Sequence, residues 1–227
     1  MIIKDRYPRT YRVKELDETL RRKRVRGEAR ILVEARECGI PTPRILDLDI
    51  ENCILIMEYL PFPSLKEVLA GINDGMDNGE GKEEGGKDEQ GKNQELYDKD
   101  QEPPESDREV GTMLKEVGRL VGVLHRNDMV HGDLTTSNIL VETDENNSTK
   151  STNHKIWFID FGLAEKTTEV EGKGVDLHVF SEAFESTHSE LMELLNDFYA
   201  GYREGNPKGG EDVLTRAREI GKRGRYS

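Results

Sequence analysis

The sequence predicts an α+β fold of two lobes that share a cleft. Short aliphatic runs typical of strands occur within residues 1–60, whereas apolar residues at helical spacing dominate residues 110–227. The 227 residues suffice for two small lobes. We therefore expect a small N-terminal sheet lobe, a hinge with its following helix over residues 61–70, and a compact helical C-terminal lobe.

Composition sets one segment apart from the rest of the chain. Hydrophobic residues make up 34% and charged residues 35%, and residues 71–109 hold 14 Asp/Glu against 5 Lys/Arg. Because this segment has little apolar surface to bury, we expect a disordered acidic insert there. It accounts for most of the net charge of −13, so the overall acidity says little about partners.

The cysteines and the hydropathy pattern limit the compartment. Cys38 and Cys53 are too few for a disulfide framework, so free thiols in a reducing compartment are expected. The sequence has no run of about 18 apolar residues and no apolar core of a signal peptide. We expect a soluble intracellular protein, cytosolic or nuclear, that does not bind a membrane.

In the N-terminal lobe, the first residues are expected to end a strand that closes with Lys4. A helix is predicted from Leu16 to Cys38, interrupted at Gly27 and stopped by Gly39. Two further strands, joined by a turn, are predicted at Ile45–Asp49 and Ile54–Tyr59.

Two segments of the chain are basic. Residues 1–30 carry 11 Lys/Arg against 5 Asp/Glu, which indicates either a solvated helix face or a nucleic-acid contact. Arg223 and Arg225 lie in a Gly-broken end, which is either a frayed tail or an arm that touches phosphate or RNA.

Ser64 is predicted to cap the short helix that follows the hinge, and the C-terminal lobe is predicted over residues 110–227. Asp176, at the start of another predicted helix, either caps that helix or holds the backbone of the loop at His131–Asn138. His125 and His131 are expected to pack and hydrogen-bond that loop rather than to bind metal. The other predicted elements are a helix over 110–124, a hairpin of 139–141 with 156–159 whose polar tip is 142–154, and helices over 188–204 and 211–221.

The segments His131–Asn138 and Ile159–Gly162 contain the groups that a phosphoryl-transfer site needs. Asp133 can orient an attacking hydroxyl or water and accept its proton. Asn138 and Asp160 offer hard oxygen ligands for Mg²⁺, whose charge neutralises nucleotide phosphates. The spacing is typical of the protein-kinase signature, so we predict a kinase-type nucleotide site.

Two further elements would complete this site. Lys4 ends an apolar-apolar-Lys strand like the one whose Lys grips the α- and β-phosphates in kinases; the alternative is an exposed charge near a terminus. Glu28 is the candidate ion-pair partner of Lys4, Glu34 is its rival, and a solvated helix face is the third alternative. The hinge residues that would offer backbone groups to an adenine edge are Glu58, Tyr59 and Leu60.

These residues together resemble one family, the small atypical kinase subunit of the KEOPS (EKC) complex. The resemblance covers nearly all of the chain except 71–109 and 142–154, and its most specific part is the Thr-Thr-Ser run in the catalytic loop. The matching stretches are residues 2–12, 28–30, 39–40, 131–138, 159–163, 172–177, 187–188 and 223–225.

The resemblance implies a minimal, RIO-like two-lobed kinase fold that uses ATP and Mg²⁺ for serine/threonine autophosphorylation or ATP hydrolysis. Asp133 would be the proton acceptor, Asn138 and Asp160 the Mg²⁺ ligands, and Lys4 with Glu28 the phosphate grip. The family works beside a metal-dependent threonylcarbamoyl-transferase subunit and small accessory subunits to modify adenosine 37 of tRNAs that read codons beginning with A. It is also linked to telomere maintenance and transcription, which implies cytoplasm and nucleus, including telomeric chromatin.

Two features depart from the ordinary kinase pattern. The sequence starts at the Lys-bearing strand, so an N-terminal lobe truncated at its start, without the loop that covers the phosphates, is expected. No long activation segment lies between Gly162 and Asp176, which agrees with the family and disfavours the docking of extended peptides.

Two other functions compete with an ATP-dependent kinase or ATPase. One is a small-molecule phosphotransferase of the aminoglycoside or choline kinase type, which also favours His-Gly-Asp; the Thr-Thr-Ser run and the short C-terminal lobe count against it. The other is a non-catalytic scaffold of the same complex, which the missing phosphate loop favours and the intact Asp133, Asn138 and Asp160 oppose.

Overall fold

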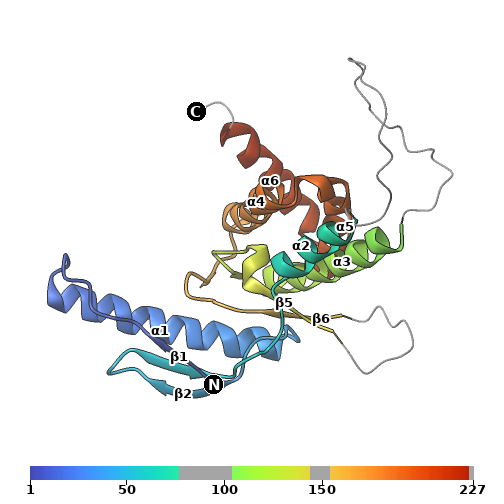
Figure 1. Ribbon diagram of the computed structural model, residues 1–227. Coiled ribbons are helices and arrows are strands. Elements are labelled where there is room, and N and C mark those ends of the chain that lie inside the picture. Colours follow the sequence, from blue (N-terminus) through green and yellow to red (C-terminus); the bar gives the residue numbers. More distant parts are fainter. Residues whose placement is uncertain (77–103, 144–153, 225–227) are drawn as a thin grey trace, which may run out of the picture.

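The computed structural model describes residues 1–76, 104–143 and 154–224, and it confirms the predicted two-lobed α+β architecture (Figure 1). Helix α1 lies with strands β1 and β2 at one end of the molecule, and helices α2 to α6 gather at the other. The β5–β6 hairpin lies between the two groups (Figure 1). The candidate catalytic loop belongs to the helical group.

The N-terminal lobe is a three-stranded antiparallel sheet covered by one long helix. The strands β1 Ile2–Asp5, β2 Ile45–Asp49 and β3 Ile54–Met57 are ordered β1-β3-β2, and Lys4 lies opposite Leu55. Helix α1 spans Lys14–Glu37 and buries an apolar stripe of Val25, Ala29, Leu32 and Ala35.

The predicted interruption of this helix at Gly27 is wrong, since α1 is continuous through that residue. A single helical glycine costs only about 1 kcal/mol relative to alanine, which the buried stripe outweighs. The predicted stop is confirmed: Gly39 follows the helix with φ +82°, a left-handed conformation that glycine adopts without a Cβ clash.

The C-terminal lobe is built around two helices that cross at very short range, α3 Glu105–Arg126 and α5 Leu195–Gly205. A Cβ on Gly118 would lie 1.9 Å from the Phe198 carbonyl oxygen, and one on Gly201 would lie 1.8 Å from the Lys115 oxygen. Only glycine permits this approach of the two backbones. The contact fixes the C-terminal end of α3, from which the chain enters the candidate catalytic loop.

The remaining elements surround this pair of helices. Ser64 caps α2 as predicted, because its Oγ accepts a hydrogen bond from the Glu67 N–H, while the Glu67 carboxylate accepts one from the Ser64 N–H. The remaining elements are α2 Leu65–Met76, β4 Met129–Val130, η1 Thr136–Asn138, β5 Ile139–Glu142, β6 Lys155–Phe158, β7 Glu165–Lys166, α4 Val170–Thr187, η2 Ser189–Leu194 and α6 Gly210–Gly224.

Several predicted boundaries need correction. Residues 71–76 continue α2 and residues 105–109 form the first turns of α3, so these ends of the expected disordered insert are helical. Residues 77–103 of that insert and 144–153 of the hairpin tip lie outside the described residues. Strand β3 ends at Met57 rather than at Tyr59, where the chain leaves the sheet for the hinge.

The two cysteines are not joined by a disulfide. Cys38 is a half-buried free thiol and Cys53 a buried one. None of the described helices is long and apolar enough to cross a membrane.

Candidate active site

The candidate catalytic loop runs from β4 to η1 and is anchored by its glycine. Gly132 has φ +79°, and a Cβ there would lie 2.3 Å from the Leu163 carbonyl oxygen. Both the left-handed backbone and the close approach require glycine. The approach places the loop beside the segment that follows Asp160.

Asp176 holds the backbone of this loop, which was one of the two roles expected for it. It is 2% exposed, and its carboxylate accepts hydrogen bonds from the backbone N–H of His131 (2.6 Å) and of Gly132 (2.8 Å). The expected alternative, a cap, is wrong because α4 begins six residues earlier, at Val170. Asp176 is therefore an interior helical residue that points at the loop.

Two buried histidines extend this network, as the sequence indicated. His125 Nε2 donates to Asp176 (3.2 Å), so its Nδ1 accepts a hydrogen bond from the Tyr202 hydroxyl (2.8 Å). His131 Nε2 donates to the Ile159 carbonyl oxygen (3.0 Å). Burial lowers the pKa of His131, more than the neighbouring Asp176 carboxylate raises it, so the ring is neutral near pH 7.

Asp133 and Asn138 are brought together within the loop. The Asn138 side-chain nitrogen donates to the Asp133 backbone oxygen (2.9 Å) and to its carboxylate (3.0 Å). The amide oxygen of Asn138, the atom able to ligate a cation, is therefore not the atom engaged with Asp133. Asp133 is half-buried, so part of its surface remains open to solvent.

Asp160 lies where the chain turns after β6, and it adopts a left-handed conformation with φ +58°. Its Oδ1 accepts hydrogen bonds from the Gly162 N–H (3.2 Å) and from Lys4 Nζ (2.5 Å). Burial raises the pKa of Asp160, but the contact with Lys4 and the Gly162 N–H together hold it below the usual value. The carboxylate is therefore ionised and half-exposed, as a cation ligand must be.

Lys4 extends from the N-terminal lobe to a residue of the C-terminal lobe. Its Nζ lies 2.7 Å from Glu28 Oε1 and 2.5 Å from Asp160 Oδ1, so it joins helix α1 to the second segment of the site. Glu28, and not its rival, is thus the ion-pair partner of Lys4. Glu34 instead contacts Lys166 (2.7 Å) and Arg30 (2.7 Å), and these contacts lower its pKa.

The predicted hinge residues and the described part of the tail take no part in the contacts that join Lys4, Glu28 and Asp160. The Glu58 side chain pairs with Arg44 (3.1 Å), Tyr59 is exposed and Leu60 is buried. The Glu58 N–H already donates to the Arg44 carbonyl oxygen (2.8 Å), and an adenine contact by this stretch stays a prediction. Arg223 lies in the last turn of α6. Arg225 lies outside the described residues.

The donor set fits Mg²⁺ with a nucleotide. Asn138 and Asp160 supply two hard oxygens, and Mg²⁺ at phosphate sites is held by one or two such protein ligands together with phosphate oxygens and water. Within residues 1–76, 104–143 and 154–224, no group of three or more His, Cys, Asp or Glu side chains could hold a metal by itself.

Sequence reasoning did not single out two cations beside the site. Arg6 Nη2 lies 2.5 Å from Glu28 Oε2, and Lys166 joins α1 to β7 through Glu34. A strand signal was available for Arg6, because residues two positions apart share one face, which places it beside Lys4. No local pattern marks Lys166, since its partner is 132 positions away.

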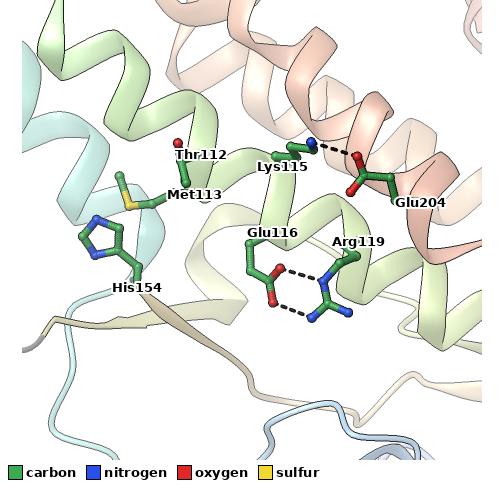
Figure 2. Close-up of a pocket in the computed structure, with 7 residues that line it drawn as sticks. All are labelled: Thr112, Met113, Lys115, Glu116, Arg119, His154 and Glu204. Atoms are coloured by element: carbon green, nitrogen blue, oxygen red, sulfur yellow. Dashed lines mark hydrogen bonds and ion pairs between the residues drawn. The ribbon is translucent and has the colours of Figure 1, made fainter. Parts of the chain in front are cut away.

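A separate cavity of about 360 Å³ lies along α3, away from these residues (Figure 2). Lys115 pairs with Glu204 (2.8 Å) and Glu116 pairs with Arg119 (2.6 Å), and all four side chains line the cavity. His154, on its edge, contacts Glu109. Because each charged side chain around the cavity has a partner within the chain, we assign it no part in the chemistry.

Comparison with known proteins reveals relatives of similar length. The chain is 36% identical to the KEOPS complex subunit Bud32 of Pyrococcus abyssi, over 100% of this chain and 84% of that protein. It is 33% identical to the probable serine/threonine-protein kinase BUD32 homolog of Archaeoglobus fulgidus, over 100% and 88%. It also matches a probable bifunctional tRNA threonylcarbamoyladenosine biosynthesis protein of Methanosarcina mazei, at 36% identity, of which it spans 32%.

More distant matches bear on the fold. The profile of the lipopolysaccharide kinase (Kdo/WaaP) family matches residues 93–193. WaaP in complex with acyl carrier protein is similar in structure, with a TM-score of 0.55 at 15% identity over 88% of this chain and 76% of that one. The Rio2 kinase from Chaetomium thermophilum has a TM-score of 0.50 at 13% identity, over 94% and 60%. Both are similar in fold, which is a kinase fold with a helical C-terminal lobe.

Proposed function

The chain belongs to the Bud32 family of KEOPS kinases, and from this membership we propose that it is an ATP-dependent atypical serine/threonine kinase or ATPase that supports threonylcarbamoyladenosine formation in tRNA. Its proposed partners are the metal-dependent threonylcarbamoyl-transferase subunit and the small accessory subunits, with tRNA reached through the complex. The proposed target is adenosine 37 of tRNAs that read codons beginning with A.

One observation carries the enzymatic part of this proposal. Lys4, from the N-terminal sheet, contacts both Glu28 of α1 and Asp160 of the C-terminal lobe. Kinases use a Lys–Glu pair of this kind to aim the Lys at nucleotide phosphates and an Asp–Gly segment to ligate the metal. The three residues come from three separate segments, so their convergence is a property of the whole fold.

The chain's own residues have separable roles in the proposed transfer. Asp133 accepts the proton of the attacking hydroxyl or water as the attacking oxygen bonds to the γ-phosphorus, while the bond from that phosphorus to the β,γ-bridging oxygen breaks and ADP leaves. Asn138 orients the Asp133 carboxylate through its side-chain nitrogen and presents its oxygen to the metal. Lys4 binds the α- and β-phosphates. Mg²⁺, when bound, would neutralise the charge that accumulates on the phosphate oxygens.

The test is ATP turnover with Mg²⁺ by the purified chain, alone and with the transferase subunit and tRNA. We expect turnover that Asp133→Ala and Asp160→Ala each reduce by at least about 100-fold. Asp212→Ala removes an equal charge from the exposed first turn of α6 and should leave turnover unchanged. No turnover by the unmodified chain, with the transferase subunit still bound, would leave only a scaffold.

A further inference from the structure

The Glu28 carboxylate holds two cations, one on each oxygen. Lys4 lies 2.7 Å from Oε1 and Arg6 lies 2.5 Å from Oε2. Glu28 is 2% exposed, and the Arg6 side chain is 17% exposed. A buried charge is tolerated only when it is paired, so both cations compensate the burial of this side chain. The Lys–Glu ion pair of kinases accounts for Lys4 but not for Arg6.

Arg6 lies within the site rather than behind it. A Cβ on Gly162 would lie 3.0 Å from Arg6 Nη2, 3.0 Å from Asp160 Oδ1 and 3.3 Å from Lys4 Nζ. The two cations and the Asp160 carboxylate therefore converge on one side of the Gly162 backbone. The Arg6 Nε is also buried, without a hydrogen-bond partner among the described residues.

The net charge of Lys4, Arg6 and Glu28 decides how strongly Lys4 can attract an anion. With Glu28 alone, the Lys4 charge would be balanced one to one, and little attraction would remain for an anion. With Arg6 added, the three side chains carry a net charge of +1, and in this structure that surplus is directed at Asp160. A nucleotide phosphate that approaches Lys4 would meet the same surplus of positive charge.

We propose that Arg6 is a positioning residue of the nucleotide site: it holds Glu28 and shares its charge, so that Lys4 keeps a positive charge for phosphate groups. The inference rests on the proposed nucleotide site. It concerns ligands that carry a diphosphate or triphosphate, and it does not extend to an uncharged nucleoside.

The test is a calorimetric titration of the purified chain with ATP, ADP and adenosine, each with Mg²⁺. Arg6→Met should weaken ATP and ADP about tenfold, the loss typical of removing one partner from a buried charged group. Adenosine binding should change by less than about twofold, because it offers no phosphate to Lys4. Arg9→Met, an exposed change of equal charge on the same segment, is the matched control and should affect none of them.

A double-mutant cycle asks whether Arg6 acts through Glu28. In a Glu28→Gln background the carboxylate charge is gone, so Arg6→Met should change ATP affinity by less than about twofold. Arg6→Lys keeps the positive charge and should recover most of the affinity, which separates the charge from the folding of the variant. Circular dichroism of each variant confirms that the fold is retained.

Three results would overturn the inference. ATP and adenosine weakened in parallel by Arg6→Met would mean that Arg6 only supports the fold. Unchanged ATP binding in Arg6→Met would mean that Glu28 and Lys4 suffice. Failure of the unmodified chain to bind ATP would refute the nucleotide site itself, and this outcome is distinguishable because it appears before any substitution is made.

Discussion

The substitution Asp176→Asn should loosen the candidate catalytic loop without changing the shape of the side chain. The carboxylate accepts hydrogen bonds from His131 N–H and His125 on one oxygen and from Gly132 N–H on the other. Asparagine has a single oxygen, so its amide nitrogen must face at least one of these donors. One buried N–H left without an acceptor, together with two weakened charge-assisted bonds, costs about 3 kcal/mol.

For a chain of this size, that loss should lower the midpoint of thermal unfolding by roughly 6–12 °C at pH 7. The difference should depend on pH in a defined direction. Burial raises the pKa of Asp176, but the contacts with His125 and His131 outweigh it and place the pKa below the usual 3.8. The stabilisation is therefore present above pH 3.8 and is lost as the pH falls through the lowered value.

The assay compares the unfolding midpoints of the original chain and of Asp176→Asn at pH 7 and near pH 3, and follows hydrogen exchange of the His131–Gly132 amides. We expect a large gap at pH 7, a smaller one near pH 3, and faster exchange of these two amides in the variant. Midpoints within about 2 °C of each other at pH 7, with unchanged exchange, would refute the claim that Asp176 holds the loop.

Two further predictions concern packing and the link between the lobes. Gly118→Ala should lower the unfolding free energy of the C-terminal lobe by about 3 kcal/mol or more in urea, because the added Cβ would overlap the Phe198 carbonyl oxygen. Gly27→Ala, where a Cβ would have nothing within 4 Å, should instead stabilise α1 by about 0.5–1 kcal/mol. Lys166→Met breaks its ion pair with Glu34, and Glu34→Gln breaks this pair together with the one to Arg30; each should lower the unfolding free energy by less than about 1 kcal/mol at low salt. The effect should vanish in 1 M NaCl, and persistence there would argue for packing instead.

Local signals carried most of the fold prediction. Strand β2 was predicted with its observed bounds and the end of α1 to within one residue, because a turn follows the strand and a glycine follows the helix. The pair of α3 and α5 was predicted as two helices, but their glycine-mediated crossing was not. That crossing depends on glycines about 80 residues apart, a distance over which periodicity carries no information.

The site was predicted in its residue types but not in its contacts. Glu28 and Glu34 remained alternatives because both lie on α1, six residues and about 240° of helical rotation apart. Only the placement of α1 against the sheet turns Glu28 to Lys4 and leaves Glu34 for Lys166. Likewise, α4 begins at Val170, earlier than its apolar pattern indicated, and this shift decides how Asp176 acts.

Burial divides the four carboxylates of the site into two kinds. Glu28 and Asp176 are each 2% exposed and bind either cations or backbone N–H groups, so their charges are already compensated. Asp133 is half-buried and the Asp160 side chain is 49% exposed. A buried, compensated carboxylate is a poor proton acceptor and a poor metal ligand, because using it would break the contacts that make its burial tolerable. Asp133 and Asp160, the accessible pair, can therefore meet a ligand. Glu28 and Asp176, the buried pair, hold Lys4 and the candidate catalytic loop in position for that ligand.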